Sequence, residues 1–133
     1  KLAIIGSRSI KEEQMVWEEI HTFVTKHSVE GVPVTIISGG AEGIDKFVKS
    51  YANKWSMDHV EFIPYFKLDR ASDYSARHFF IRNKQIIDNA DKVLAIWDGV
   101  SKGTEHGIKY SQKKGKQVMV IKRNPISHNE SSE

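Results

Sequence analysis

Glycine and hydroxyl residues follow three apolar segments of the chain, and this combination is typical of phosphate-binding turns. The three stretches are Gly6-Ser7-Arg8, the sequence SGGAEGID at residues 38–45, and the sequence GVSKGT at residues 99–104. Where such a turn leads into a helix, backbone N–H groups point outward at the positive end of the helix dipole, which favours an anion. Each turn alone is equally explained by the freedom of glycine to adopt positive φ. Their combination predicts a phosphate site.

Arg82 is the charged residue with the most informative position. It lies three residues after Phe79 and four before Ile86, on the apolar stripe of a helix that should face a sheet. A charge on such a stripe is costly unless it is paired or reaches an opening. We expect its guanidinium to hold a phosphate or carboxylate by a bidentate contact, and the alternative is a structural pair with Asp45 or Asp98.

Three carboxylates near the glycine turns are candidate general acids or bases: Glu42, Asp45 and Glu105. Nothing in the sequence brings together any two of Glu42, Glu105 and His106, a further conceivable acid or base. Asp45 is explained at least as well by the dipole of the helix that it opens as by a ribose contact. The six histidines lack metal-ligand spacing and the chain has no cysteine, so we expect no metal site, no thiolate chemistry and no required cofactor.

The elements that must position these residues follow from the apolar periodicity. Short apolar runs predict strands at residues 2–5, 34–38, 60–63, 93–97 and 117–121. Helical spacing predicts four helices between them: one that a capping box of Ser9 and Glu12 opens, then residues 44–55, 75–89 and 105–114. Residues 65–75 lack a clear period, and we expect a long ordered loop there.

This alternation predicts an α/β fold, a Rossmann-like, doubly wound, five-stranded parallel sheet with helices on both faces. Right-handed crossovers and a reversal after the third strand give the expected strand order 3-2-1-4-5. The second, first and fourth strands then become neighbours, and their carboxyl ends carry the three glycine turns. A ligand is therefore expected where the order reverses, between the first and fourth strands.

Length and composition fit one domain, which we expect to span residues 1–122 of the 133, followed by a polar, disordered tail at residues 123–133. No apolar run approaches the roughly 18 residues that a membrane span needs, so we expect no membrane contact and a cytoplasmic location. The net charge of +3 suits a polyanionic partner or simply a soluble surface. The same two readings apply to the basic run Lys109, Lys113, Lys114 and Lys116.

In combination, these motifs resemble those of the SLOG superfamily. That group includes the Rossmann-like domain of the DNA-processing protein A (Smf) family and the Lonely Guy phosphoribohydrolases. The resemblance rests on Gly6-Ser7-Arg8, residues 38–45, Arg82-Asn83 and residues 101–104, in the same order and context, and it extends over residues 2–121. The YspA-like branch is the most similar, through the sequence WDGVSKGT at residues 97–104.

The resemblance implies a small-molecule, nucleotide-derived ligand, such as a nucleoside phosphate, ADP-ribose or an NAD relative, which the protein senses or carries. The ligand-binding residues expected from the turns and from the resemblance are Gly6, Ser7, Arg8, Ser38, Gly39, Gly40, Ala41, Gly43, Asp45, Arg82, Asn83, Asp98, Gly99, Ser101, Gly103 and Thr104.

Two other functions stay open, and so does whether the chain is an enzyme. A nucleotide N-glycosidase of the phosphoribohydrolase type would use Glu42, Asp45 or Glu105, but those enzymes carry an acid three residues after the threonine of the Gly-Thr motif, where this chain has Gly107. A single-stranded DNA-binding module would need a basic groove with stacking aromatic residues. The resemblance also implies pairing through helices, as a homodimer.

Overall fold

The computed structural model describes residues 1–39, 43–62 and 76–123, and within the helix that begins at residue 76 it describes side chains from residue 81 onward. The loop expected at residues 65–75 and nearly all of the tail expected at residues 123–133 lie outside the described residues.

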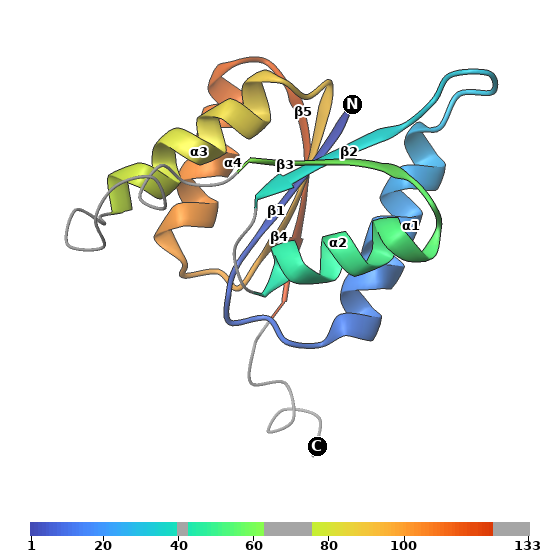
Figure 1. The fold of residues 1–133 in the computed structure, drawn as a ribbon. Helices are drawn as coiled ribbons and strands as arrows, with labels where there is room; N and C mark the ends of the chain where they lie inside the picture. Colours follow the sequence, from blue (N-terminus) through green and yellow to red (C-terminus); the bar gives the residue numbers. More distant parts are fainter. Residues whose placement is uncertain (40–42, 63–75, 124–133) are drawn as a thin grey trace.

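The described residues form alternating strands and helices, coloured along the chain in Figure 1. In chain order they are β1 (Leu2–Gly6), α1 (Glu13–His27), β2 (Thr35–Gly39), α2 (Ile44–Lys54), β3 (Asp58–Phe62), α3 (Ala76–Asp88), β4 (Lys92–Trp97), α4 (Lys102–Lys113) and β5 (Gln117–Lys122).

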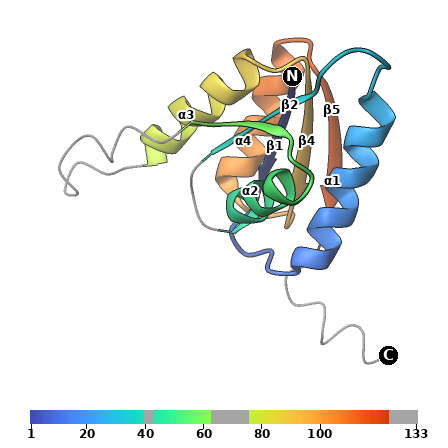
Figure 2. The same cartoon turned by 45° about the vertical axis from the view of Figure 1, so that its right-hand side comes forward.

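The strands form one five-stranded sheet in the order β3-β2-β1-β4-β5, with every neighbouring pair parallel. The α/β architecture and the strand order predicted from the sequence are therefore confirmed. Figures 1 and 2 show α1 and α2 on one face of the sheet and α3 and α4 on the other. The carboxyl ends of all strands point to the same edge, which we call the carboxyl edge.

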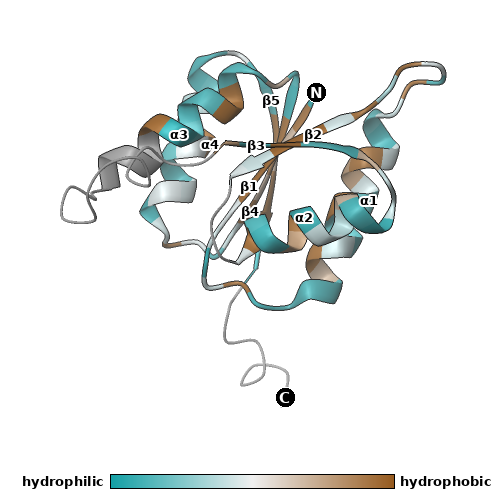
Figure 3. Cartoon of the chain, viewed as in Figure 1, coloured by the Kyte–Doolittle hydropathy of each residue, from teal (hydrophilic) through white to brown (hydrophobic). Residues whose placement is uncertain are grey.

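The core has one layer on each face of the sheet, because successive strand side chains point to opposite faces. Leu2 and Ile4 of β1 pack in the layer with α1 and α2, whereas Ala3 and Ile5 pack in the layer with α3 and α4. Figure 3 shows the resulting contrast between apolar central strands and polar outer sides of the helices. In the part of the chain that the structure describes, no helix is both long and apolar enough to cross a membrane.

The start predicted for α1 is wrong, but its predicted buried stripe is confirmed and consists of Val16, Ile20, Phe23 and Val24. The helix begins at Glu13, and no side chain caps its first turn. The Ser9 hydroxyl instead donates a hydrogen bond of 2.6 Å to Asp98 Oδ2. The predicted capping box is therefore wrong, since a partner from the turn after β4 takes the hydroxyl that the local pattern assigned to the helix.

Two other helix boundaries differ from the sequence prediction. Helix α4 begins at Lys102, three residues earlier than expected, so Gly103 and Thr104 lie in its first turn. Helix α2 ends at Lys54, and Trp55 stays 54% exposed rather than joining the buried face. Ser56 then turns the chain with a φ of 52°.

Gly6 ends β1 beside the first residue of α2, and this contact leaves no space for a side chain. A Cβ at residue 6 would lie 2.8 Å from Ile44 Cγ2 and 2.9 Å from Ile44 Cβ. Ile44 is itself fully buried, so it cannot move away without disturbing the core.

We predict that Gly6→Ala lowers the free energy of unfolding by about 1–3 kcal/mol through overpacking. Ile44→Ala, which removes the γ carbons, alone costs about 2–5 kcal/mol. Urea denaturation of both single variants and the double variant should show that the double variant loses at least ~0.5 kcal/mol less than the sum. Strict additivity would contradict the contact.

Candidate functional site

The turn after β1 is hydrogen-bonded to the turn after β4. The Ser7 backbone N–H donates to the Ile96 carbonyl at 3.0 Å, and the Ser7 hydroxyl accepts from the Asp98 backbone N–H at 3.1 Å. The same hydroxyl lies 3.2 Å from the hydroxyl of Thr104, in the first turn of α4. Ser7 and Thr104 are both buried. Two of the three predicted turns thus meet at the carboxyl edge.

Asp98 organises the turn after β4. Its Oδ1 accepts the backbone N–H groups of Val100 and Ser101 at 2.9 and 2.7 Å, and its Oδ2 accepts the hydroxyls of Ser9 and Ser101, both at 2.6 Å. Burial raises the pKa of the Asp98 carboxyl, but these hydrogen bonds outweigh burial and hold that pKa well below its ordinary value. The carboxylate is therefore charged and is held by the loop.

The first turn of α4 has no side-chain cap. Ser101 stands at the N-cap position, where a serine hydroxyl ordinarily accepts a helix N–H, but its hydroxyl donates to Asp98 instead. The first N–H groups of a helix have no acceptor within the helix. Gly103 adds space at this turn, since a Cβ there would meet nothing within 4 Å.

Arg82 and Asp45 form a buried ion pair between α3 and α2. Arg82 is 7% exposed and Asp45 is 9% exposed, and Arg82 Nη1 lies 3.6 Å from Asp45 Oδ2. Asp45 Oδ1 also accepts the backbone N–H of Gly39 at 3.3 Å. Gly39 must lack a side chain, because a Cβ there would overlap the guanidinium and lie 2.7 Å from Asp45 Oδ2. Of the two partners considered for Arg82, the structure pairs it with Asp45.

Asn83 connects this ion pair to α4. Its Oδ1 accepts from Arg82 Nε at 3.1 Å, and its Nδ2 donates to the Gly103 carbonyl at 3.3 Å. We call the resulting series of contacts the polar chain: Gly39, Asp45, Arg82, Asn83 and Gly103. It crosses the carboxyl edge from β2 to the first turn of α4.

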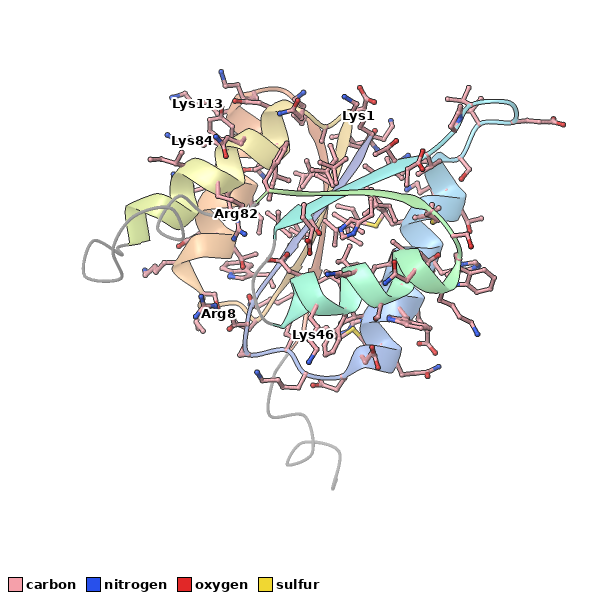
Figure 4. All side chains as sticks on the ribbon, in the orientation of Figure 1. Lys1, Arg8, Lys46, Arg82, Lys84 and Lys113 are labelled. Atoms are coloured by element: carbon pink, nitrogen blue, oxygen red, sulfur yellow. The ribbon has the colours of Figure 1, made fainter. Side chains whose placement is uncertain are left out.

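Arg8 adds a second positive charge at this edge. Burial lowers the pKa of Arg82, the Asp45 carboxylate raises it, and the charge of Arg8 lowers it further. The two guanidinium groups are thus close enough to interact, and Figure 4 shows both at the carboxyl edge, with Lys46 near the start of α2. The backbone of Arg8 also lies beside Gly43, at the start of α2, since a Cβ on Gly43 would lie 3.1 Å from Arg8 Cα.

Other predicted site residues do not join this arrangement. The buried Ser38 hydroxyl lies 2.7 Å from Nε2 of His59 on β3, on the α1–α2 side of the sheet. Gly99 turns the chain with a φ of 91° beside the side chain of Lys122. Glu105 pairs with Lys109 at 3.5 Å. Gly40, Ala41 and Glu42 lie outside the described residues.

Two contacts made near the predicted site residues were not expected from the sequence. The local sequence around Ser9 is typical of a helix cap, and it gave no sign that the Ser9 hydroxyl donates to Asp98. His59 reaches Ser38 only because β2 and β3 pair in register, and no local pattern in the sequence indicates that contact. Among the described residues, no cluster of three or more histidine or acidic side chains is able to hold a metal ion.

Comparison with known proteins links the chain to one family. The model of the family described as "YspA, cpYpsA-related SLOG family" matches residues 1–68, about half of the chain. The matched part contains the first two glycine turns and Asp45, whereas Arg82 and α4 lie beyond it. No curated protein and no solved structure matches the chain.

We predict that Asp98→Asn lowers stability in a pH-dependent way. The pKa of Asp98 is lower in the folded than in the unfolded protein, so its contribution is complete above the unfolded value, about 3.9, and declines as the pH falls toward the folded value. Urea denaturation at pH 7 should show a loss of about 1.5–3 kcal/mol, the scale of a charged hydrogen bond, and the difference from the parent should narrow below about pH 4.

Asp58→Asn is the matched control, because Asp58 is an exposed aspartate on β3. It should stay within about 0.5 kcal/mol of the parent at both pH values. An Asp98→Asn deficit that is the same at pH 7 and in acid would rule out the hydrogen-bonded carboxylate as its cause.

Proposed function

Because the chain belongs to the YspA, cpYpsA-related SLOG family, we propose that it binds a nucleotide-derived ligand at the carboxyl ends of β1, β2 and β4. The ligand class comprises nucleoside phosphates, ADP-ribose and NAD relatives, and the protein acts as a sensor or carrier of that ligand. Phosphate binding at the end of a parallel sheet where the strand order reverses agrees with the general behaviour of such folds.

The observation that carries this proposal is Gly103 in the first turn of α4. Glycine inside a helix costs about 0.5–1 kcal/mol relative to alanine. No neighbour requires a glycine at this position, since a Cβ would meet nothing within 4 Å. A glycine there instead leaves the backbone N–H groups of this uncapped turn open to the close approach of a phosphate. The missing side chain is then explained by the ligand.

Arg82 supplies the charge that a phosphate at this turn needs. Asp45 and Asn83 hold the guanidinium, and Asn83 also contacts the carbonyl of Gly103. The guanidinium is thus fixed relative to α4 before a ligand arrives, which lowers the entropy cost of binding. Arg8 adds positive potential from the exposed side of the same edge.

The candidate catalytic carboxylates give less support to N-glycoside hydrolysis. Asp45 forms an ion pair with Arg82, and Glu105 forms one with Lys109. Gly107 faces the core, where a Cβ would lie 2.6 Å from Ile5 Cδ1, so the position of the phosphoribohydrolase acid has no space in this chain. A binding role requires none of these groups to move a proton.

We predict that Gly103→Ala has opposite effects on stability and on ligand affinity. The added methyl group should raise the free energy of unfolding by up to about 1 kcal/mol, because it improves helix propensity without a clash. It should weaken nucleotide binding about tenfold or more, since it occupies the approach to the N–H groups. Thermal-shift screening with nucleoside mono-, di- and triphosphates, ADP-ribose and NAD selects the ligand, and calorimetry then measures affinity.

Gln112→Ala, an exposed change at the far end of the same helix, is the control and should leave affinity unchanged. Equal nucleotide affinity in Gly103→Ala and in the parent would contradict the proposed position of the phosphate. Recovery of the ligand unchanged after incubation supports a sensor or carrier, whereas release of free base would show an enzyme.

We predict that replacing Arg82 and Asp45 together lowers nucleotide affinity but costs less stability than replacing Arg82 alone. Arg82→Gln alone removes the cation that lies 3.6 Å from the buried Asp45 carboxylate and should cost about 3–5 kcal/mol of stability. The double variant Asp45→Asn/Arg82→Gln removes both charges and should retain more stability than that single variant. Its nucleotide affinity should fall by about 1.5–3 kcal/mol, the value of a charged hydrogen bond. Parent-like affinity in the folded double variant would assign Arg82 a purely structural role.

A further inference from the structure

Lysine side chains gather on the outer side of α3 and α4, around one aromatic ring. Lys84 belongs to α3, Lys109 and Lys113 belong to α4, and Lys114 follows directly, and all four side chains are exposed. The ring is that of Tyr110. We call these five residues the lysine face. Figure 4 shows Lys84 and Lys113 on neighbouring helices, well away from Arg8 and the carboxyl edge.

Two of these lysines lie over the ring of Tyr110. The Nζ atoms of Lys84 and Lys114 lie 5.5 and 5.6 Å from the ring centroid, within the range of cation–π contacts. The Tyr110 hydroxyl donates to Asp88 Oδ1 at 2.6 Å, which fixes the ring on the surface. Two ammonium groups therefore sit close to the same ring at the ends of flexible side chains.

The lysine face has more positive charge than its acids neutralise. Glu105 pairs with Lys109 at 3.5 Å, and Asp88 is the acceptor of the Tyr110 hydroxyl. Within the described part of the chain, Lys84, Lys113 and Lys114 have no carboxylate within salt-bridge distance.

The dipole of α4 favours Lys113 and Lys114 at the end of that helix, but it does not account for Lys84, which lies in the middle of α3. The positive potential reaches His106 as well, since burial and the charge of Lys84 both lower the pKa of His106. Like charges brought together on a surface raise the local concentration of anions. The lysine face thus has the electrostatic character of a polyanion-binding surface.

We propose that the lysine face binds single-stranded nucleic acid, with the lysines on phosphates and Tyr110 stacked on a base. Single-stranded nucleic acid offers phosphates to the lysines and unstacked bases to the aromatic ring. Neither kind of contact depends on the nucleotide sequence. A base that stacks on Tyr110 displaces one ammonium group, which then meets the adjacent phosphate. This surface is separate from the proposed nucleotide site, and its binding does not depend on that site.

An anionic membrane fits this surface less well. Peripheral helices that bind lipid place large apolar side chains beside their lysines. The exposed positions of α4 are instead filled by lysine and glutamine, with the part-exposed Glu105 and Tyr110 among them. A nucleic acid duplex also fits less well, because its bases are stacked on each other and are not open to Tyr110.

The test measures binding of fluorescein-labelled oligothymidylate by fluorescence anisotropy at about 50 and 200 mM salt. The face variant is Lys109→Gln/Lys113→Gln/Lys114→Gln. The control variant, Lys26→Gln/Lys49→Gln/Lys54→Gln, removes the same charge from exposed positions on α1 and α2. We expect the face variant to bind about tenfold more weakly and the control within about twofold, and the log–log salt slope of the face variant to be shallower by about 2.

Tyr110→Leu should also weaken binding several-fold, whereas Tyr110→Phe, which keeps the ring, should bind like the parent. Four outcomes overturn the proposal: no binding by the parent at the lower salt, equal losses in the two triple variants, equal affinity for a duplex of the same length, and equal or tighter binding to phosphatidylserine vesicles. Circular dichroism of each variant confirms that the fold is intact.

Discussion

Parallel strands that end at one edge are the constraint from which the candidate site is built. Because β1, β2 and β4 are neighbours and all run in the same direction, their carboxyl ends must lie together, whatever side chains follow them. The reversal of the strand order at β1 sends α2 to one face of the sheet and α4 to the other. The first turns of both helices then begin at this edge, and residues far apart in the sequence meet there.

The buried ion pair of Arg82 and Asp45 uses this geometry. Removing two charges from water costs several kcal/mol per ion, so a pair of this kind persists only where its geometry and additional hydrogen bonds compensate. The backbone N–H of Gly39 on one side and Asn83 on the other supply those bonds. The same side chains that compensate for burial also connect β2 to α4. Stability and positioning of the candidate site are therefore properties of one set of contacts.

Much of the fold follows from local patterns that the sequence displays. Apolar runs and helical stripes predicted every strand and helix in the described residues, and the buried stripe of α1 was predicted residue by residue. The position of Arg82 on an apolar stripe likewise predicted a charge that needs a partner, and Asp45 was one of the two acids considered. These predictions succeed because periodicity reports burial directly.

The contacts that the sequence did not predict are those whose partners are distant in the chain. Ser9 satisfies the local rule for a helix cap, but Asp98, 89 residues away, takes its hydroxyl. Ser38 is predicted to bind ligand because of the glycines that follow it, and no local pattern indicated that strand pairing also brings it to His59. A hydroxyl can satisfy only a few partners, and the folded topology determines which partner is nearest.

The family model matches only part of the polar chain, and this has a consequence for how such a sequence changes during evolution. Asp45 lies in the half of the chain that the family model matches, and Arg82 lies in the other half. A substitution at either position alone removes one charge of this buried pair, so its cost depends on the residue at the other position and the two positions are epistatic. Gly39 is constrained with them, since any side chain there displaces the guanidinium. Lineages should therefore keep these three residues together or lose them together, even where the surrounding surface diverges.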